Sequence, residues 1–529
     1  MVARVMSSGP QIPQFYAGRS ILITGGTGFM GKVLVERILA TCPDVGRLFL
    51  LMRPKKNSSP EVRLLQLKQS QVFDVIRQNN PKQLDKIVTI AGDVEQPGLG
   101  LNSGALQLLQ EVSVVFHAAA TLKFDEELKK AVDMNLRSVV ALLEMCDKLP
   151  HIEAFVHVST AYSNADQDVV EERVYPAPTD MAQLLALADA APADLLKLIT
   201  PKYIAPKPNT YTYTKAMAES AVNRYPGRGY PVAIFRPTIV VSSLRYPFPG
   251  WVENLNGPSG VVVGAGKGML HVFCCRESAR ADLLPVDIAI DTLIAVAWEI
   301  ATDRPLEAVV YNCSTGENPI TWHRFETTLW RAMREYPMDA PLWYPSGTTF
   351  ENRYVLKTYE FLLQTAPLHL AEYVARLLRI KKRLSLIIAS QKLSAMNDVL
   401  TFFSLREWQF KNERVRKLRA RLSPQDAAIY NLDPNTIEWD EHCYNFVRGT
   451  RKYLLKEKDQ DLEAAKRHVH RMYILHNAVK LISSILLLRV VLQNKFARKF
   501  VYGTLRLLLS LFSALFARLT PSALQKLKI

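Results

Sequence analysis

The residues best suited to chemistry lie in one short segment, NTYTYTKAMAE at 209–219, where two tyrosines precede a lysine. On a helix, residues three or four positions apart share a face, so Tyr211 can stand beside Lys215 whereas Tyr213 cannot. A tyrosine beside a lysine is either an ordinary packing pair or a proton donor whose pKa the ammonium lowers from about 10. Which interpretation holds depends on the other motifs in the chain.

A hydroxyl that could assist such a proton donor lies upstream, in FVHVSTAY at 155–162. Its apolar run predicts a buried strand that ends at Ser159 and Thr160. Because adjacent residues of a strand face opposite ways, we expect only one of the two hydroxyls to enter a site. The residues themselves leave both as candidates.

A glycine-rich loop, GGTGFMG at 25–31, follows the apolar run RSILIT and precedes the helical pattern KVLVERILA. Its spacing suits a tight turn, a close approach to a pyrophosphate and a tightly packed helix that presents its N-terminus to the phosphates. The sequence therefore predicts a dinucleotide site that contains Gly25, Thr27, Gly28, Phe29, Met30 and Gly31.

The end of the next apolar run indicates which dinucleotide binds. Arg53, followed by Lys55 and Lys56, stands where an NAD-binding fold usually has an acid for the ribose 2′-hydroxyl. A guanidinium suits a 2′-phosphate, so NADPH is the predicted cofactor. Residues after the later strands are predicted to contact the adenine or the nicotinamide half: Asp93, Val94, Ala118, Ala119, Val158, Pro237 and Thr238.

The elements that must position these residues form an alternating pattern. Short apolar runs at 19–24, 47–53, 86–94, 112–120, 153–160 and 232–238 are separated by helical patterns. This alternation predicts an α/β fold with a doubly wound, Rossmann-type parallel sheet. Prolines, glycines and aromatic residues after 240 indicate loops on the substrate side, in which GVVVGAGKG at 260–268 is expected to be a turn. Beyond 350 the pattern is mainly helical.

Glycine loop, strand-end hydroxyl and Tyr-x-x-x-Lys, in this order, resemble the extended short-chain dehydrogenase/reductase superfamily. That resemblance implies that Tyr211 protonates the substrate carbonyl and that Lys215 lowers the tyrosine pKa and binds the nicotinamide ribose. It also favours Thr160 over Ser159 as the third catalytic residue.

Finer stretches, among them ILITGGTGFMGKVLVERIL at 21–39, YPFPGWVENLNGPSG at 246–260 and WDEHCYNFVRGTRKYLLKE at 439–457, resemble the fatty acyl-CoA reductases, particularly the insect type. The resemblance implies NADPH-dependent, four-electron reduction of a long-chain acyl-CoA to a primary fatty alcohol, with release of CoA. It also implies a catalytic domain at 15–345, a helical C-terminal domain at 355–458 and a hydrophobic tail.

The tail contains two apolar segments, 472–492 and 500–519, each close to the ~20 residues that span a bilayer. Lys480, Arg489 and Arg506 interrupt them, which leaves a spanning helix, a shallow hairpin or a pair of amphipathic helices docked on the protein. We expect a membrane protein, on the endoplasmic reticulum with the catalytic domain facing the cytosol.

The composition restricts the remaining functions. The net charge is +16, but no zinc-finger spacing and no block of basic and aromatic residues is present, so no nucleic-acid partner is expected. Six scattered cysteines without a C-x-x-C pair indicate a reducing compartment, and no cluster has metal-ligand spacing. Two alternatives keep the same fold: a membrane-bound two-electron dehydrogenase of the hydroxysteroid or sugar type, and a non-catalytic NADP-binding scaffold. The intact Thr160, Tyr211 and Lys215 argue against the scaffold.

Overall fold

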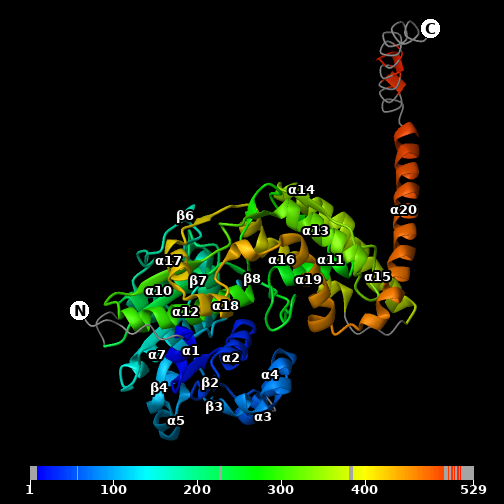
Figure 1. Ribbon diagram of the computed structural model, residues 1–529. Helices are drawn as coiled ribbons and strands as arrows, with labels where there is room; N and C mark the ends of the chain where they lie inside the picture. The colour runs from blue at the N-terminus through cyan, green and yellow to red at the C-terminus, as the bar shows by residue number, and fades with distance from the viewer. Residues whose placement is uncertain are drawn as a thin grey trace, which may run out of the picture.

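The computed structural model describes residues 9–55, 58–224, 229–379 and 385–493 and isolated residues between 499 and 513. Within this part of the chain a seven-stranded parallel sheet has the order β12-β7-β5-β4-β1-β2-β3 (Figure 1). The order reverses between β1 and β4, which is where open α/β sheets bind ligands. The strands are β1 (Ser20–Thr24), β2 (Leu48–Met52), β3 (Ile87–Ala91), β4 (Val112–His117), β5 (Ala154–Val158), β7 (Val232–Pro237) and β12 (Val309–Cys313).

The predicted doubly wound α/β fold is confirmed, and the packing of β1 shows why its three central residues are all apolar. Ile21 and Ile23 belong to the core shared with α2 (Phe29–Thr41) and α12 (Val286–Asp303). Leu22 belongs to the core on the other face, with α7 (Ser138–Cys146) and α10 (Thr210–Asn223). A strand covered on both faces has no solvent side, so its sequence does not alternate between polar and apolar residues.

Six of the seven strands were predicted; β12 was not. Several apolar runs were also predicted to be longer than the strands they contain. β3 ends at Ala91 and β4 at His117, so Asp93 and Ala118 lie in the loops that follow. The residues just past each strand end face the ligand crevice of the sheet.

Helices pack on both faces of the sheet. The remaining α-helices before residue 300 are α1 (Gln11–Tyr16), α3 (Pro60–Lys68), α4 (Asp74–Asn79), α5 (Ser103–Leu108), α6 (Leu128–Val132), α8 (Met181–Ala190), α9 (Ala193–Tyr203) and α11 (Pro258–Gly266). The segment at 260–268 is thus mainly helical, which corrects the expected turn. Lys267 at its end donates to the Asp339 carbonyl (2.7 Å) and pairs with Glu457 (2.6 Å).

The C-terminal part is mainly helical, as predicted. Its helices are α13 (Trp322–Glu335), α14 (Arg353–Glu360), α15 (Ala366–Leu377), α16 (Leu386–Ser404), α17 (Glu413–Arg421), α18 (Pro424–Ile429) and α19 (Trp439–Gly449), with the π-helical segment η7 (Phe361–Thr365) between α14 and α15. Short parallel pairs join this part to the earlier chain, β14 (Thr348–Phe350) with β9 (Val272–Cys274) and β15 (Gln409–Phe410) with β6 (Val169–Val170). The two parts therefore share hydrogen bonds as well as apolar contacts.

A buried ion pair also fixes the C-terminal part on the sheet. Arg37 of α2 and Asp291 of α12 lie 2.6 Å apart, and Asp291 accepts a hydrogen bond from the backbone N–H of Asn431 (2.8 Å). Burial raises the pKa of Asp291 to about 6, and Arg37 offsets part of that increase. Removing either partner would leave a buried charge unpaired, which commonly costs about 3–5 kcal/mol.

The apolar tail begins with α20 (Leu462–Gln493), which runs away from the body in Figure 1. Among the described residues, the stretch 459–489 is the one helix long and apolar enough to cross a bilayer. It covers most of the predicted segment 472–492. The second predicted segment, 500–519, falls mostly outside the described residues.

Candidate active site

A cavity of about 710 Å³ lies at the carboxyl ends of the parallel strands. It brings together the cofactor and catalytic residues predicted from the sequence. Its lining includes Gly25, Thr27, Gly28, Phe29, Met30, Gly31, Arg53, Asp93, Val94, Ala118, Ala119, Val158, Thr160, Tyr211, Lys215, Pro237 and Thr238.

The glycine loop has the geometry that a bound dinucleotide requires. Gly25 has φ +73°, and a Cβ at this position would lie 2.7 Å from the carbonyl carbon of Ala118. A Cβ on Gly31 would lie 2.2 Å from the Gly25 carbonyl oxygen, so the helix can pack against the loop only with glycine here. Gly28 caps α2, whose N-terminus lines the cavity. Backbone N–H groups and the helix dipole thus fit a pyrophosphate.

Two arginines stand at the end of the cavity beside β2. Arg53 pairs with Glu95 (2.6 Å), and Arg63 of α3 donates to the Arg53 carbonyl (2.5 Å) and to the Thr27 hydroxyl (3.3 Å). Both arginines and Lys55 line the cavity, whereas Lys56 lies outside the described residues. Sequence reasoning missed Arg63, because it lies ten positions after Arg53 and no motif marks it.

The helix α10 places Tyr211 and Lys215 on one face. The Asn209 side chain caps this helix by accepting from the Thr212 N–H (2.9 Å). The Tyr211 side chain is hydrogen-bonded to Thr160, and the Lys215 ammonium, only 2% exposed, donates to the Val158 carbonyl (2.7 Å). The two residues thus share one face of α10, as their spacing predicted, and that face meets the end of β5.

Tyr213 lies on another side of α10, as its spacing predicted. It is fully buried, its hydroxyl lies 2.5 Å from that of Thr179, and its ring packs on Tyr203. These contacts belong to the core that α10 shares with α8 and α9. Tyr213 is therefore a packing residue.

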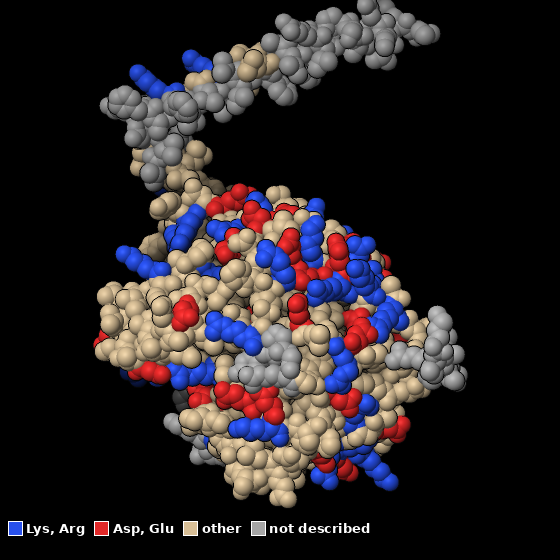
Figure 2. Space-filling model, turned by 90° about the vertical axis from the view of Figure 1, so that its left-hand side faces the viewer, with Lys and Arg blue, Asp and Glu red and all other residues tan. Residues whose placement is uncertain are grey.

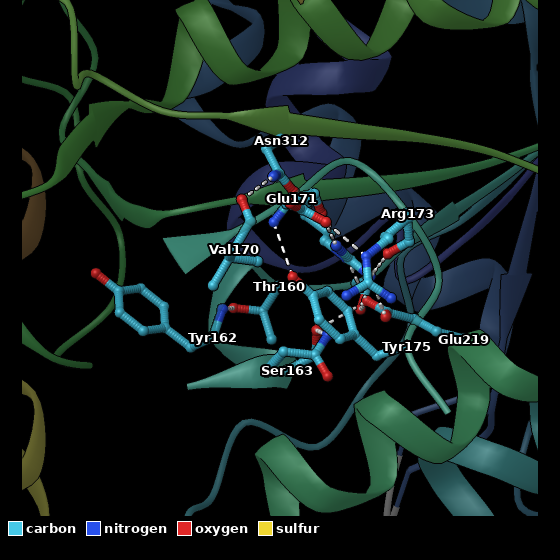
Figure 3. Close-up of polar contacts among 12 residues, drawn as sticks. Thr160, Tyr162, Ser163, Val170, Glu171, Arg173, Tyr175, Glu219 and Asn312 are labelled. Carbon is cyan, nitrogen blue, oxygen red and sulfur yellow. Dashed lines mark hydrogen bonds and ion pairs between the residues drawn. The ribbon is translucent and has the colours of Figure 1, made fainter. Parts of the chain in front are cut away.

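The hydroxyls of Ser159 and Thr160 have different hydrogen-bond partners. The Ser159 hydroxyl donates to Glu219 (2.5 Å), which also accepts from Ser163 (2.9 Å) and pairs with Arg236 (2.7 Å). Figure 3 shows Ser163 and Glu219 close together in this network and Tyr162 pointing away from it. Because Glu219 holds Ser159, it is Thr160 that remains to face Tyr211.

The pKa values of Lys215 and Tyr211 indicate the protonation state of each side chain at neutral pH. Burial lowers the pKa of Lys215 to about 8, and Glu219 offsets part of that decrease. Burial raises the pKa of Tyr211 above its usual range, while the Thr160 hydrogen bond lowers it in part. The net direction is opposite to the lowering expected from Lys215. A tyrosine with this pKa keeps its proton at neutral pH and can donate it to an oxygen that gains negative charge.

Beyond Tyr211 the cavity continues between α11 and helices of the C-terminal part. Phe124 lies between the rings of Tyr211 (5.6 Å) and Phe403 (5.5 Å), and Phe403 belongs to α16. This section is lined mostly by apolar side chains of α11, α13 and α16, among them Val261, Val262, Leu329, Trp330, Met333, Met396, Val399 and Leu400. Sequence reasoning missed this lining. The spacing 396, 399, 400 and 403 indicates one apolar face of a helix, but not what that face covers.

Comparisons with known proteins agree with this architecture. Residues 23–293 match the model of an NAD-binding family described as "Male sterility protein", and residues 363–457 match a second model with the same description. Fatty acyl-CoA reductase 1 of Xenopus laevis is 35% identical over 494 residues, 93% of this chain and 95% of that protein. Fatty acyl-CoA reductase 2 of Homo sapiens is 34% identical over 467 residues, 88% of this chain and 90% of that protein.

Solved structures share the fold. The reductase domain of a nonribosomal peptide synthetase from Mycobacterium tuberculosis has a TM-score of 0.55 at 18% identity, covering 84% of this chain and 93% of that domain. The terminal R domain of the myxalamid pathway has a TM-score of 0.54 at 17% identity, covering 82% and 90%. At this identity the likeness extends to the fold alone.

Proposed function

Because the chain belongs to the fatty acyl-CoA reductase family and is an oxidoreductase with an NAD(P)-binding domain, we propose that it reduces a long-chain acyl-CoA to a primary fatty alcohol with NADPH. The reaction consumes one acyl-CoA, two NADPH and two protons, and it yields the alcohol, free CoA and two NADP⁺. Four electrons are transferred in two steps at one site, through an aldehyde.

The observation that carries this proposal is the continuity of the cavity. One end has the glycine loop and the arginines, the middle has Thr160 and Tyr211, and the other end is apolar. A dinucleotide fits the first section, and a long hydrocarbon chain suits the last. The reacting carbonyl would then lie between them, within reach of the hydroxyls.

NADPH, when bound, supplies the hydride for each reduction. Thr160 and Tyr211 orient the carbonyl oxygen by hydrogen bonds, and Tyr211 gives its proton to that oxygen as it becomes negative. The Lys215 ammonium stabilises the tyrosinate that remains and binds the ribose. After the first step the C–S bond breaks, the C=O bond of the aldehyde forms, and the proton of the new hydroxyl leaves with the CoA sulfur. Tyr211 then regains a proton from solvent, and the second step yields the alcohol.

Preference for NADPH over NADH is part of the proposal. Arg53, Lys55 and Arg63 give the β2 end of the cavity three positive side chains, opposed there by Asp93 and Glu95. A 2′-phosphate can replace these carboxylates as a partner of the guanidinium groups.

Attachment to a membrane is also proposed, on the basis of α20. We place the protein on the endoplasmic reticulum with its catalytic domain in the cytosol. All six cysteines lie in the described part of the chain and are free thiols, which suits a reducing compartment.

The deciding experiment incubates membranes that contain the protein with palmitoyl-CoA and NADPH, and measures fatty alcohol, free thiol and NADPH consumption. Two NADPH consumed for each alcohol and each thiol would support the proposal. Thiol release without alcohol would instead indicate a two-electron, aldehyde-forming reductase. If NADPH is not consumed at any acyl-chain length, the proposal is wrong. The Tyr211→Phe variant supplies the matched background.

A further inference from the structure

The helices α14 and α15, with η7 between them, expose apolar side chains in place of polar ones. Tyr354 is 88% exposed and Leu377 73% exposed, and Phe361, Leu362, Leu370 and Tyr373 are exposed as well. We call these six residues the outer apolar face. A helix on the surface of a water-soluble protein normally carries polar side chains on this side. Contiguous exposed apolar surfaces mark interaction sites.

On the same helices, several polar side chains lie on the inner side, which faces the body of the protein. Glu360, Gln364 and Glu372 are buried there beside Leu356 and Leu368. Glu360 pairs with Lys357 of the same helix (2.8 Å), and Lys357 also pairs with Asp398 of α16 (2.9 Å). Gln364 accepts from the backbone N–H of His271 (3.3 Å), and Glu372 accepts from the N–H of Leu386 (2.9 Å). These bonds hold the inner side on the body, so the outward direction of the apolar residues follows from the packing.

The helices that carry the outer apolar face are linked, through His271 and the segment 343–346, to the point where α20 leaves the body. His476 of α20 accepts a hydrogen bond from the Trp343 indole (2.9 Å), and the ring of Tyr473 packs on Tyr344. The neighbouring Ser346 carbonyl contacts His271 (2.8 Å), whose N–H is bound by Gln364 of η7. Figure 1 shows α14, α15 and α20 at the same end of the molecule. A bilayer that receives α20 would therefore meet these helices.

The charges and aromatic rings of this surface suit a bilayer with anionic lipids. Of the exposed charged side chains between residues 351 and 379, Arg353, Arg376 and Arg379 are basic and Glu351 is acidic. Tyr354 and Tyr373 have rings with one polar end, which favour the boundary between acyl chains and headgroups. The opposite side of the molecule, seen in Figure 2, carries Lys and Arg interspersed with Asp and Glu, as an ordinary water-facing surface does.

We propose that the outer apolar face lies in the interfacial layer of the same bilayer that holds α20, about 5–10 Å below the headgroup boundary. The body is then docked on the membrane at two places and is not merely tethered by its tail. The helix α16, which lines the apolar section of the cavity, packs directly against α15, so that section lies one helix below the lipid. This inference depends on the proposed attachment of α20 to a membrane and not on the proposed reaction.

The full chain offers a direct test because all six of its own cysteines are buried. Leu377→Cys, Leu486→Cys in α20 and Leu306→Cys would each be labelled with a polarity-sensitive thiol fluorophore. Leu306, 81% exposed, follows α12 at the edge of the sheet and is the matched control on the body. The labelled proteins are reconstituted in vesicles of phosphatidylcholine and phosphatidylserine, with or without lipids that carry a quencher just below the headgroup.

Docking predicts a blue-shifted, lipid-quenched emission for the label at Leu377 and for that at Leu486, and neither effect at Leu306. Adding Leu370→Asp should reduce the quenching at Leu377 while leaving Leu486 unchanged. If Leu486 is quenched and Leu377 has the emission of the Leu306 control, the tail alone holds the protein and the inference is wrong. If Leu486 itself is not quenched, the proposed membrane attachment fails, and the inference fails with it.

The test must also distinguish lipid from a second copy of the chain as the partner that covers the outer apolar face. It would shield the label at Leu377 without lipid quenching, and it would allow thiol cross-linking between two Leu377→Cys chains. That combination would overturn the inference. Lipid quenching of the label at Leu377 that persists in nanodiscs holding one chain each would support contact with the bilayer.

Discussion

Replacing Lys215 with methionine should abolish turnover and change the stability of the folded protein in a pH-dependent way. Lys215 is almost completely buried, and burial lowers its pKa from 10.5 to about 8. Holding this ammonium in the interior therefore costs the folded state about 3 kcal/mol at neutral pH. Methionine has a similar length and no charge, so the variant avoids this cost.

The direction of the pH effect follows from the two pKa values. Below pH 8 the lysine is protonated in both the folded and the unfolded protein, so the full cost is present. Between pH 8 and 10.5 the folded protein loses this proton while the unfolded chain keeps it, and the stability of the wild type rises with pH. Most of the 3 kcal/mol should be regained by pH 10. The methionine variant lacks this rise.

The absolute difference at neutral pH is smaller, because Lys215 also donates to the Val158 carbonyl. Leaving that buried acceptor without its donor costs about 1–3 kcal/mol. The variant should therefore be from equally stable to about 2 kcal/mol more stable at pH 7, and less stable than the wild type at pH 10. The change in this difference between pH 7 and pH 10, about 2.5 kcal/mol, does not depend on the cost at Val158.

Thermal unfolding of both proteins in the same detergent measures the change. The usual unfolding entropy per residue gives about 1 kcal/mol per degree for a folded body of this size, so the difference in midpoint should change by about 2–3 °C between pH 7 and 10. Lys202→Met, at an exposed position of α9, is the control and should follow the wild type. A Lys215→Met difference that stays constant over this range would refute the argument from the buried ammonium.

Three further outcomes are expected. Tyr211→Phe should lower kcat by about 10²–10⁴-fold while NADPH still binds in a fluorescence titration. Tyr213→Phe, which loses the hydroxyl contacts with Thr179 and Tyr203, should retain turnover and lose about 1 kcal/mol of stability. Arg63→Ala should raise the KM for NADPH by about 10- to 100-fold and leave that for NADH nearly unchanged, and equal effects on both would contradict a role at the 2′-phosphate. The wild-type kcat/KM should fall as the pH rises through about 8, where Lys215 loses its charge; a flat profile up to pH 9.5 would exclude the ammonium from the reaction.

The parts of the site that were predictable from sequence depend on local patterns. The turn at Gly25 needs a positive φ, and Gly31 needs to lack a side chain, so both leave a signal in the residue types themselves. Tyr211 and Lys215 are four apart on one helix, so their shared face also follows from the spacing. The family resemblance favoured Thr160, and the structure adds the physical reason. Glu219, four residues after Lys215, holds the Ser159 hydroxyl.

The parts that could not be predicted depend on contacts between distant segments. Arg63 reaches the cavity because α3 folds back beside β2, which no spacing in the sequence reveals. The strand β12 pairs with β7 after some seventy intervening residues. On α14 and α15 the helical period is visible in the sequence, but which side faces the body is decided by partners such as His271 and Leu386.

The contacts of α16 indicate that the apolar section of the cavity is preformed. Asn397, fully buried in the middle of α16, accepts from the N–H of Cys274 (3.0 Å) and donates to the carbonyl of Val272 (3.3 Å). Both partners belong to β9, so the side chain completes hydrogen bonds that the strand would otherwise leave open. Moving α16 away would expose these groups without partners, and each buried unsatisfied group costs about 1–3 kcal/mol.

The two ends of α16 are held as well. Its first residue, Leu386, is bound by Glu372 of α15, and its last, Ser404, donates its hydroxyl to the Cys274 carbonyl. A helix fixed at its start, middle and end is a wall of the cavity and not a lid. The width of the apolar section is then set by the side chains that α16 presents, above all Phe403, which packs on Phe124 next to Tyr211. Selectivity among acyl chains is expected to depend on those side chains and not on a movement of the helix.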